Sequence, residues 1–447
     1  MREGERGLSF HAESGPTSWG RVSRAAQQTA RPRFIGEVTG WAAQDQGPRL
    51  AVGLRRSYGD TCAFAAGRLV AMPGLDRFIA FDAERGLVTA EAGLSLGELL
   101  KVCVPRGWFI PVTPGTRWVT LGGSIANDVH GKNHTRNGSF GRHVRGFVLL
   151  RSDRGIVEVT PEAEPELYAA TIGGLGLTGV ILQVTLQLQA IASAWLDAEV
   201  FPLGGLADFF ALNQDSLDRS EHTVAWFDWA KRGAKAGLGF YSRADWAAEG
   251  GLVPHEDRAR TVPVEAPGFV LNRLSLSLFN SAVRTIQLIE PGRRREHYGP
   301  SFYRLDALQD WNKLYGPAGF YQYQCVIPPG PGPDALQEML QIIASSSEGP
   351  ALVVLKTFGD LPAPGMMSFP RPGYTLALDF RNRGRMTLEL LGRLDAVVRA
   401  AGGALYPAKD GRLPRAMLDF GFPQFERFLA LRDPACGSDF LERMGVR

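Results

Sequence analysis

Short apolar runs separated by glycine and proline constrain the fold of this chain more than any other feature. The 447 residues include 53 Gly and 29 Pro, and most runs between them are rich in Val, Ile, Leu and Phe. Such punctuation favours many short strands joined by turns over long helices. The sequence therefore predicts a strand-heavy α+β fold, and its length allows two domains with a substantial core each.

Individual segments carry the signals for strands and helices. Strands are predicted at 49–54, 69–72, 77–81, 87–91 and 180–188, with a hairpin formed by 147–150 and 156–160. Helices are predicted from a capping box at Ser95 and Glu98 to about Val102, over 206–212, after Asp334 as N-cap, and over 387–401 before Gly402. The segment 290–300 (EPGRRREHYGP) has no periodicity and is expected to be a mobile loop.

Composition excludes several classes of protein. A formal charge of +3 is too small to indicate nucleic acid as a partner. Cys62, Cys103, Cys325 and Cys436 are scattered, so neither a disulfide framework nor a structural zinc site is expected. No apolar run is long enough to cross a membrane, and residues 1–14 lack the apolar core of a signal peptide. We expect a cytoplasmic protein.

One glycine-rich motif matches a dinucleotide-binding fingerprint but lies in the wrong structural context for it. Residues 174–179 (GLGLTG) fit the dinucleotide fingerprint G-x-G-x-x-G literally. That fingerprint requires a helix after the glycines, so that the pyrophosphate meets a helix N-terminus, whereas here a strand is predicted to follow. A Rossmann-type NAD site is therefore not expected.

Two other glycine loops are more informative. Residues 53–60 (GLRRSYGD) and 113–134 (TPGTRWVTLGGSIANDVHGKNH) place Gly beside Ser, Thr or Arg after an apolar strand. Glycine exposes backbone N–H groups to an anion without obstruction by a side chain, so two such loops suit one diphosphate. His130 and His134 are spaced like a metal pair, but the intervening Gly131 and Asn133 disfavour the helix that such a pair needs, so no metal is predicted.

These loops resemble the flavin-binding signature of the vanillyl-alcohol oxidase and p-cresol methylhydroxylase superfamily. The similarity is carried by 56–60 (RSYGD), 113–117 (TPGTR), 122–134 and 138–141 (GSFG). Further motifs resemble the family of decaprenylphosphoryl-β-D-ribose oxidases within it: 18–21 (SWGR), 225–228 (AWFD), 310–316 (DWNKLYG), 321–324 (YQYQ), 405–410 (LYPAKD) and 438–440 (SDF).

The resemblance implies an FAD-binding domain at 1–193, a substrate domain at 194–403 with an antiparallel sheet over the flavin, and a segment at 404–447 that returns to the FAD-binding domain. Members that attach flavin covalently commonly use a His in the first glycine loop, where this chain has Arg55 to Ser57. The FAD is therefore expected to be non-covalent. Its implied binding residues are Gly53, Arg56, Ser57, Tyr58, Gly59, Asp60, Pro114, Gly115, Thr116, Gly122, Gly123, Ala126, Asn127, His130, Gly131, Asn133, Gly179, Val180 and Tyr406.

Oxidation of a secondary alcohol removes a hydroxyl proton and transfers a hydride to the flavin, so the site needs a base and groups that fix the sugar. By resemblance, Lys409 reaches the substrate face of the flavin, and Lys409 and Tyr58 are the catalytic candidates. A Lys that serves as base requires a lowered pKa. The alternative is a Lys that only pairs with a phosphate or with Asp410.

Period-2 spacing independently predicts a polar face on two strands. Gln322 and Gln324 share one face, and Thr375, Ala377 and Asp379 share another, opposite apolar residues. Lys356 lies within an apolar strand and so needs an anionic partner, for which a substrate phosphate would serve. The substrate-binding candidates are therefore Gln322, Gln324, Lys356, Thr375 and Ala377; a solvent-facing sheet surface is the alternative for any one strand.

Two positions depart from the family pattern. Mycobacterial members have a Cys where this chain has Ala377, and an Asn where it has Thr375. Nitroaromatic inhibitors capture that thiol, so no covalent capture is expected here. The same changes leave the identity of the sugar open.

The leading hypothesis is FAD-dependent oxidation of the ribose 2′-hydroxyl of a polyprenylphosphoryl-β-D-ribose to a ketone, as the first half of an epimerisation. A short-chain reductase would then be the partner, and contact with a membrane would be at most peripheral. One alternative is an FAD-dependent oxidase of a soluble sugar, polyol or aldonolactone in secondary metabolism. Another is a binding protein without enzymatic activity, which predicts a colourless preparation.

Overall fold

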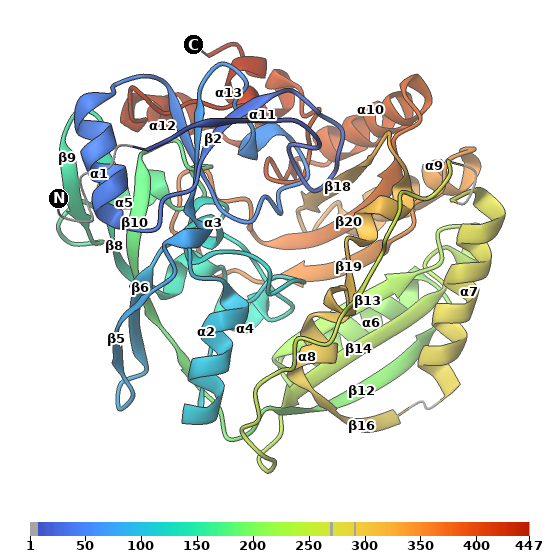
Figure 1. Ribbon diagram of the computed structural model, residues 1–447. Helices are drawn as coiled ribbons and strands as arrows, with labels where there is room; N and C mark the ends of the chain where they lie inside the picture. Colours follow the sequence, from blue (N-terminus) through green and yellow to red (C-terminus); the bar gives the residue numbers. More distant parts are fainter. Residues whose placement is uncertain (1–7, 269–270, 290–291, 447) are drawn as a thin grey trace.

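The computed structural model describes residues 8–268, 271–289 and 292–446. Three sheets dominate it (Figure 1). The four-stranded sheet has the order β1 (His11–Glu13), β2 (Gln27–Ala30), β4 (Arg68–Ala71) and β3 (Arg49–Val52). The five-stranded antiparallel sheet has the order β5 (Phe78–Asp82), β6 (Leu87–Glu91), β10 (Val180–Gln187), β8 (Val144–Arg151) and β9 (Gly155–Val159). The predicted α+β class is confirmed.

The largest sheet has eight strands, and its printed pairings are all antiparallel. Its order is β16 (Gly292–His297), β12 (Trp195–Leu203), β14 (Gly239–Trp246), β13 (His222–Phe227), β19 (Val353–Phe358), β20 (Gly373–Arg381), β18 (Phe320–Ile327) and β21 (Ala404–Leu405). Two short pairs complete the strands: β7 (Trp108–Phe109) with β11 (Gln189–Ala190), and β15 (Arg260–Thr261) with β17 (Leu308–Gln309).

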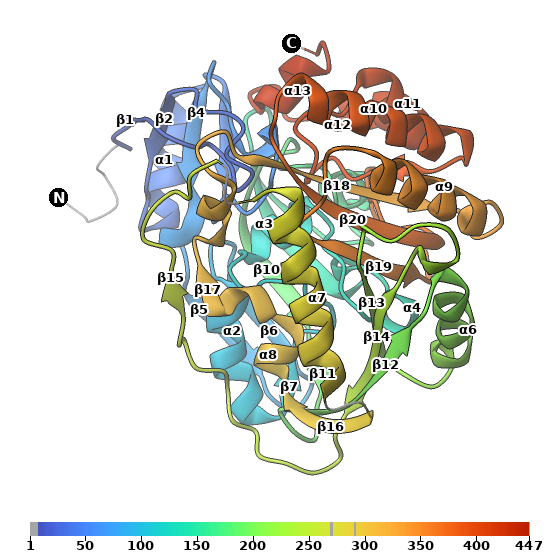
Figure 2. The ribbon, with the colours of Figure 1, turned by 90° about the vertical axis from the view of Figure 1, so that its right-hand side faces the viewer.

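Helices cover these sheets. Figure 2 shows α6 (Leu206–Leu217) and α7 (Arg273–Ile289) on opposite sides of the eight-stranded sheet. The others are α1 (Ile35–Gln44), α2 (Leu96–Cys103), α3 (Leu121–Ala126), α4 (His134–Asn137), α5 (Pro165–Thr171), α8 (Tyr298–Phe302), α9 (Gly332–Ser345), α10 (Arg385–Ala400), α11 (Arg415–Gly421), α12 (Phe425–Leu431) and α13 (Asp439–Arg443). Within the described residues, no helix combines the length and apolarity needed to cross a bilayer.

The C-terminal segment returns to the N-terminal part of the chain, as the colours of Figure 1 show. The guanidinium of Arg443 on α13 makes two hydrogen bonds, of 2.7 and 2.9 Å, to the carboxylate of Asp60. Cα partners Arg49 and Cys436 form a parallel bridge nearby. The C-terminal segment therefore packs against the N-terminal part of the chain beside the first glycine loop.

The segment 255–306 ties the large sheet to the five-stranded one. Tyr298, Phe302 and Tyr303 are buried in the same apolar cluster as Phe109 of β7 and Leu186 of β10, a strand of the five-stranded sheet. Burial of an aromatic side chain stabilises such a contact by about 2 kcal/mol or more. The two parts of the chain are thus joined by a shared core as well as by polar contacts.

Several predicted elements are confirmed. The hairpin at 147–160 is the pair β8 and β9, and α10 ends before Gly402, whose φ is +70°. Ser95 caps α2, because its Oγ accepts a hydrogen bond of 3.1 Å from the backbone N–H of Glu98. Strand β10 follows the 174–179 glycines directly, so the arrangement that a Rossmann site requires is absent there.

Two predictions about local structure are wrong. Helix α9 has Pro331 at its N-cap, and Asp334 lies in its first turn, where a carboxylate also interacts favourably with the helix dipole. The expected mobile loop at 290–300 is ordered over its described residues as β16 and α8; residues 290–291 lie outside them. Arg293 pairs with Glu199 and Arg295 with Asp197 across β12, so the arginines form a cross-strand ladder that periodicity within one segment does not reveal.

Candidate active site

The two predicted phosphate-binding loops lie side by side. An added methyl group on Gly53 would collide with the side chain of Thr120, which precedes α3. A methyl group on Gly131 would lie 2.8 Å from the backbone oxygen of Thr113. These close approaches require glycine and bring both loops, and the 130–134 segment, to one place.

Backbone donors in both loops are left without protein acceptors. Within the described residues, the N–H groups of Arg55, Arg56 and Ser57 donate to no backbone or side-chain oxygen, and neither do those of Gly115 and Thr116. Unpaired N–H groups from two adjacent loops are the donor set that a diphosphate needs. These residues therefore fit the diphosphate of a bound dinucleotide such as FAD.

The returning C-terminal segment brings Lys409 to the first loop. The backbone N–H of Tyr58 donates to Ala408 O at 3.1 Å, and a methyl group on Gly59 would come within 2.6 Å of the backbone nitrogen of Gly411. As a result, Lys409 Nζ lies 4.1 Å from the ring centroid of Tyr58, a cation–π distance. The two catalytic candidates of the sequence analysis are in contact.

The predicted polar face of the sheet lies beside this pair. Gln322 on β18 is opposite Asp379 on β20, and its Nε2 donates to Asp379 Oδ1 at 2.6 Å. Gln324 is opposite Ala377, and its Nε2 donates to Thr375 Oγ1 at 3.1 Å. The predicted alternation on both strands is confirmed.

His130 connects this face to the second glycine loop. Its Nε2 lies 2.8 Å from Gln324 Nε2, an amide donor, so the imidazole nitrogen accepts. Burial and the neighbouring Lys356 hold the pKa of His130 well below its usual value, which is consistent with a neutral ring. The ring also packs against Phe358 and Tyr406.

Three lysines at the site lack a carboxylate partner. In the part of the chain that the structure describes, Lys132, Lys356 and Lys409 form no ion pair within 4.0 Å. Burial lowers the pKa of Lys132 to about 7, and that of Lys356 and of Lys409 to about 8. Lys132 was not among the predicted site residues, although it lies within the H-G-K-N-H motif that carried the resemblance.

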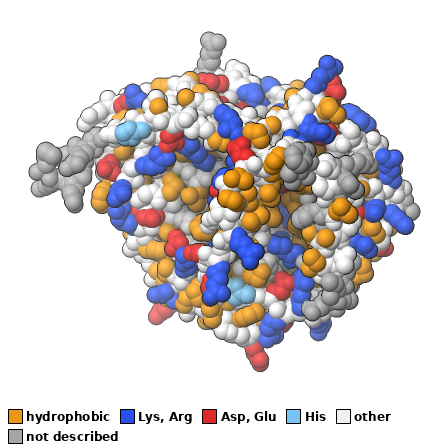
Figure 3. Space-filling model, turned by 45° about the vertical axis from the view of Figure 1, so that its right-hand side comes forward, with side chains coloured by type: hydrophobic (Ala, Val, Ile, Leu, Met, Phe, Trp, Pro, Cys, Tyr) orange, Lys and Arg blue, Asp and Glu red, His pale blue; other side chains and the backbone are white. Residues whose placement is uncertain are grey.

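A pocket opens between the glycine loops and the sheet. Its lining includes His130, Lys132, Lys356 and Arg304, together with the carboxylates Glu221 and Glu296. It also includes aromatic and aliphatic side chains: Phe109, Trp226, Phe240, Trp246, Phe302, Leu352 and Val354. Hydrophobic and basic side chains gather around a hollow on the face shown in Figure 3. A pocket of this kind suits a ligand with an anionic group and an apolar body.

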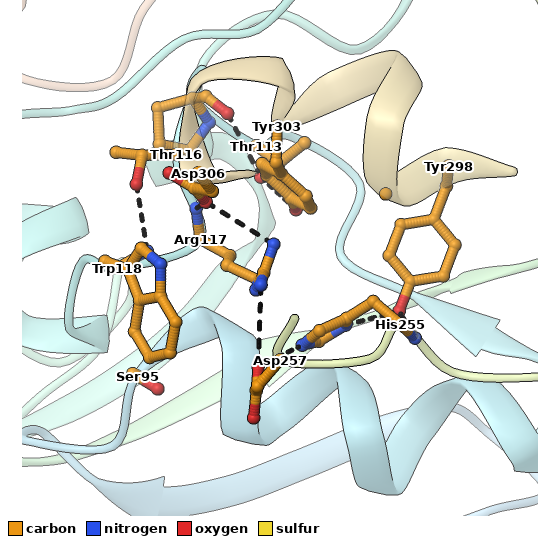
Figure 4. A network of polar contacts seen from close by, with 12 residues as sticks. Ser95, Thr113, Thr116, Arg117, Trp118, His255, Asp257, Tyr298, Tyr303 and Asp306 are labelled. Carbon is orange, nitrogen blue, oxygen red and sulfur yellow. Dashed lines mark hydrogen bonds and ion pairs between the residues drawn. The ribbon is translucent and has the colours of Figure 1, made fainter. Parts of the chain in front are cut away.

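A polar network holds the second glycine loop against the segment 255–306 (Figure 4). The Arg117 backbone N–H donates to Asp306 Oδ2 at 2.9 Å, and the Arg117 guanidinium lies 3.6 Å from Asp306 and 3.4 Å from Asp257. The hydroxyl groups of Thr113 and Tyr303 are 2.6 Å apart. This network fixes the loop whose N–H groups are unpaired. Local sequence patterns do not predict it, because its partners lie more than a hundred residues away along the chain.

Other predicted cofactor residues occupy different places. The Tyr406 hydroxyl donates to Asn127 O at 2.7 Å, beside α3. Asp60 is paired with Arg443, and Asn133 Nδ2 donates to Pro111 O at 2.8 Å and to Glu221 at 3.1 Å. Val180 is buried in the cluster that packs on α1, and the methyl group absent from Gly179 would meet Leu150 O at 2.7 Å.

Comparison with known proteins agrees with this geometry. Residues 34–160 match the model of an FAD binding domain. Decaprenylphosphoryl-beta-D-ribose oxidase of Mycolicibacterium smegmatis is 32% identical over 95% of this chain and 96% of its own length. An uncharacterized protein of Streptomyces coelicolor is 34% identical over 79% of this chain and 100% of its own length.

More distant similarity reaches another group of oxidases. L-gulonolactone oxidase of Mus musculus is 27% identical over 42% of each chain. The Mycolicibacterium smegmatis relative, the matched domain and the paired glycine loops agree on FAD as the cofactor and on oxidation as the class of reaction. This chain belongs to the family of FAD-dependent oxidoreductases that includes decaprenylphosphoryl-β-D-ribose oxidase.

Proposed function

We propose that this enzyme oxidises the 2′-hydroxyl of a polyprenylphosphoryl-β-D-ribose to a ketone. The observation that carries the proposal is the pocket that Lys132 and Lys356 line together with several aromatic side chains. Lys132 and Lys356 have backbone carbonyl acceptors but no carboxylate partner, so they suit the phosphate, and the apolar side chains suit the first prenyl units. A soluble sugar would not need those apolar side chains.

Lys409 and Tyr58 act on the reacting hydroxyl in this proposal. Bound FAD supplies the acceptor for the hydride that leaves the sugar carbon. Lys409 accepts the hydroxyl proton when neutral, which its pKa of about 8 permits near neutral pH. Burial raises the pKa of Tyr58 well above its usual value, so the phenol stays protonated and orients the sugar as a donor.

The remaining site residues bind and orient. Gln322, Gln324 and Thr375 present polar groups to the sugar from the sheet in this proposal, and Ala377 is a small side chain opposite Gln324. The N–H groups of the two glycine loops hold the FAD diphosphate. The FAD is non-covalent in this proposal, and release of all the flavin on acid precipitation would agree with it.

The organisation of the chain and its partners belong to the same proposal. We assign FAD binding to 1–193 and 404–447 and substrate binding to 194–403. A ketone product must be reduced to complete an epimerisation, so a reductase of the short-chain type is the expected partner. The lipid substrate calls for at most peripheral contact with a membrane.

The site of oxidation is tested with two short-chain substrates. Farnesylphosphoryl-β-D-ribose and its 2-deoxy counterpart are added anaerobically to the FAD-loaded enzyme, and flavin reduction is followed by absorption. We expect the first to reduce the flavin and the second to bind without reducing it. Equal reduction by both would show that another hydroxyl is oxidised.

A further inference from the structure

Asp379 is a buried carboxylate at the site that the proposed mechanism does not use. It lies on β20, is 1% exposed, and has no Lys or Arg within 4.0 Å among the described residues. Its Oδ1 accepts the 2.6 Å hydrogen bond from Gln322 Nε2. The hydroxyl of Tyr315 also hydrogen-bonds to this carboxylate. These two neutral partners offset part of the cost of burying the charge, but neither supplies a cation, so the place of Asp379 beside the site calls for a role.

Charged and titratable groups reach Lys409 from each element around it. The first loop contributes the ring of Tyr58, at 4.1 Å, and the second loop contributes His130. Strand β19 contributes the cation Lys356, and β20 contributes the anion Asp379. The neighbouring carboxylate of Asp410 lies 3.1 Å from the guanidinium of Arg412 instead.

The Tyr58 ring that Lys409 contacts packs on Phe320 of β18, with the ring centroids 5.4 Å apart. Gln322 lies two residues further on the same face of β18 and holds the Asp379 carboxylate. Asp379 is therefore the negative charge of this cluster that acts on Lys409, and Gln322 fixes that carboxylate. We propose that Asp379, held by Gln322, is a positioning residue that sets the protonation state of Lys409. This inference deepens the proposed function, in which neutral Lys409 accepts the hydroxyl proton. It assigns to Asp379 an electrostatic effect on the base and no contact with the hydroxyl itself.

The direction of the effect follows from charge. Burial lowers the pKa of Lys409, Asp379 raises it, and Lys356 lowers it further. Removing the carboxylate leaves burial and Lys356 unopposed, so the pKa of Lys409 must fall. The Gln322 hydrogen bond favours ionised Asp379, whose pKa burial raises to about 6, so loss of Gln322 weakens the same effect in part.

The test measures Lys409 directly and needs no substrate. FAD-loaded full-length enzyme is pulse-labelled with trace acetic anhydride across a pH series, and acetylation of the Lys409 peptide is quantified by mass spectrometry. Only the neutral amine reacts, so the labelling rate titrates with Lys409. Lys356 in the same sample is the internal reference, because burial alone shifts its pKa.

Three variants are compared with wild type. In Asp379→Asn the midpoint of Lys409 should move down by about one pH unit, while that of Lys356 stays in place. Asp379→Glu should restore most of the shift. Glu221→Gln is the matched control, since this carboxylate accepts from Asn133 and Asn137 at another wall of the pocket and should leave the Lys409 midpoint unchanged.

An unchanged Lys409 midpoint in folded, FAD-loaded Asp379→Asn would overturn the inference. If that variant does not fold, Gln322→Leu takes its place, with a smaller downward shift expected and no shift contradicting the inference. Failure of the enzyme to oxidise a lipid-linked sugar would affect only the proposed function, because the labelling uses no sugar.

Discussion

At the residue scale, the proposed mechanism depends on Lys409, whose pKa burial lowers. The pKa of Lys409 is lowered to about 8, so its neutral fraction grows as the pH rises from 7 to 9. The rate of flavin reduction by substrate should rise over the same interval. Substitution Lys409→Ala should lower that rate by about a hundredfold or more and remove the rise, as loss of a general base does.

Anaerobic stopped-flow absorption across pH measures both quantities. Tyr58→Phe keeps the ring against Lys409 and removes only the phenol donor. Its rate of flavin reduction should therefore still rise with pH, but should stay below that of the wild type. If the rate of flavin reduction by Lys409→Ala still rose with pH as in the wild type, another group would accept the proton.

Ala377 makes a second prediction at this scale. It faces Gln324 across β18 and β20, beside the polar face of the site. Nitroaromatic inhibitors that capture a thiol in related enzymes should leave this protein at its native mass after treatment in the presence of substrate. Ala377→Cys should gain the adduct, and a mass shift of the wild-type chain would contradict the account.

The sequence predicted which side chains come together where a motif or strand alternation carried them. Lys409, Tyr58, Gln322 and Gln324 lie together, as strand alternation and the family pattern indicated. Lys132 was not predicted, because its position depends on contacts across the chain, such as the hydrogen bond of Lys132 Nζ to Ser301 O at 2.6 Å. Hydrophobic periodicity within one segment does not predict contacts with residues far away in the sequence.

At the element scale, the loop that carries Lys409 is braced by α10. The Arg412 guanidinium makes hydrogen bonds of 2.6 and 2.9 Å to Asp395 on that helix, and both side chains are nearly buried. Substitution Asp395→Ala leaves the buried guanidinium with Asp410 alone. Loss of one partner of a buried pair costs about 3 kcal/mol.

Chemical denaturation should show this loss of stability in Asp395→Ala. Asp419→Ala is the matched control: it removes an acceptor of the more exposed Arg415 on α11 and should cost under about 1 kcal/mol. Equal stability of the two variants would mean that the brace does not hold the Lys409 loop.

Local signals predicted elements well when the cause of the structure was local. The Ser95 cap of α2 and the stop of α10 at Gly402 are short-range effects, and both were predicted. Strand β16 was expected to be a loop, because its stability comes from β12, almost a hundred residues earlier. An edge strand of charged residues has no apolar alternation to reveal it.

At the scale of the whole molecule, we expect FAD binding to depend on contact between the second glycine loop and the segment that carries Tyr303 and Asp306. Asp306 receives the backbone N–H of Arg117 from the second glycine loop, and Tyr303 meets Thr113 in the same loop. Asp306→Ala frees that loop, so it should weaken FAD binding by about tenfold, which corresponds to about 1.4 kcal/mol.

Titration of the FAD-depleted protein with FAD, followed by flavin fluorescence, measures this change. Asp197→Ala is the control, because its ion pair with Arg295 is exposed and lies on the outer strands of the large sheet. Identical FAD affinity in both variants would show that the network in Figure 4 does not support the cofactor loop.

The measurement that tests the central claim most directly is anaerobic addition of farnesylphosphoryl-β-D-ribose to the yellow, FAD-loaded enzyme, with L-gulono-1,4-lactone added to a second sample. We expect the flavin absorption to bleach with the lipid-linked sugar and to persist with the lactone. Bleaching by the lactone alone would contradict the account and would assign the enzyme to the oxidation of soluble sugars.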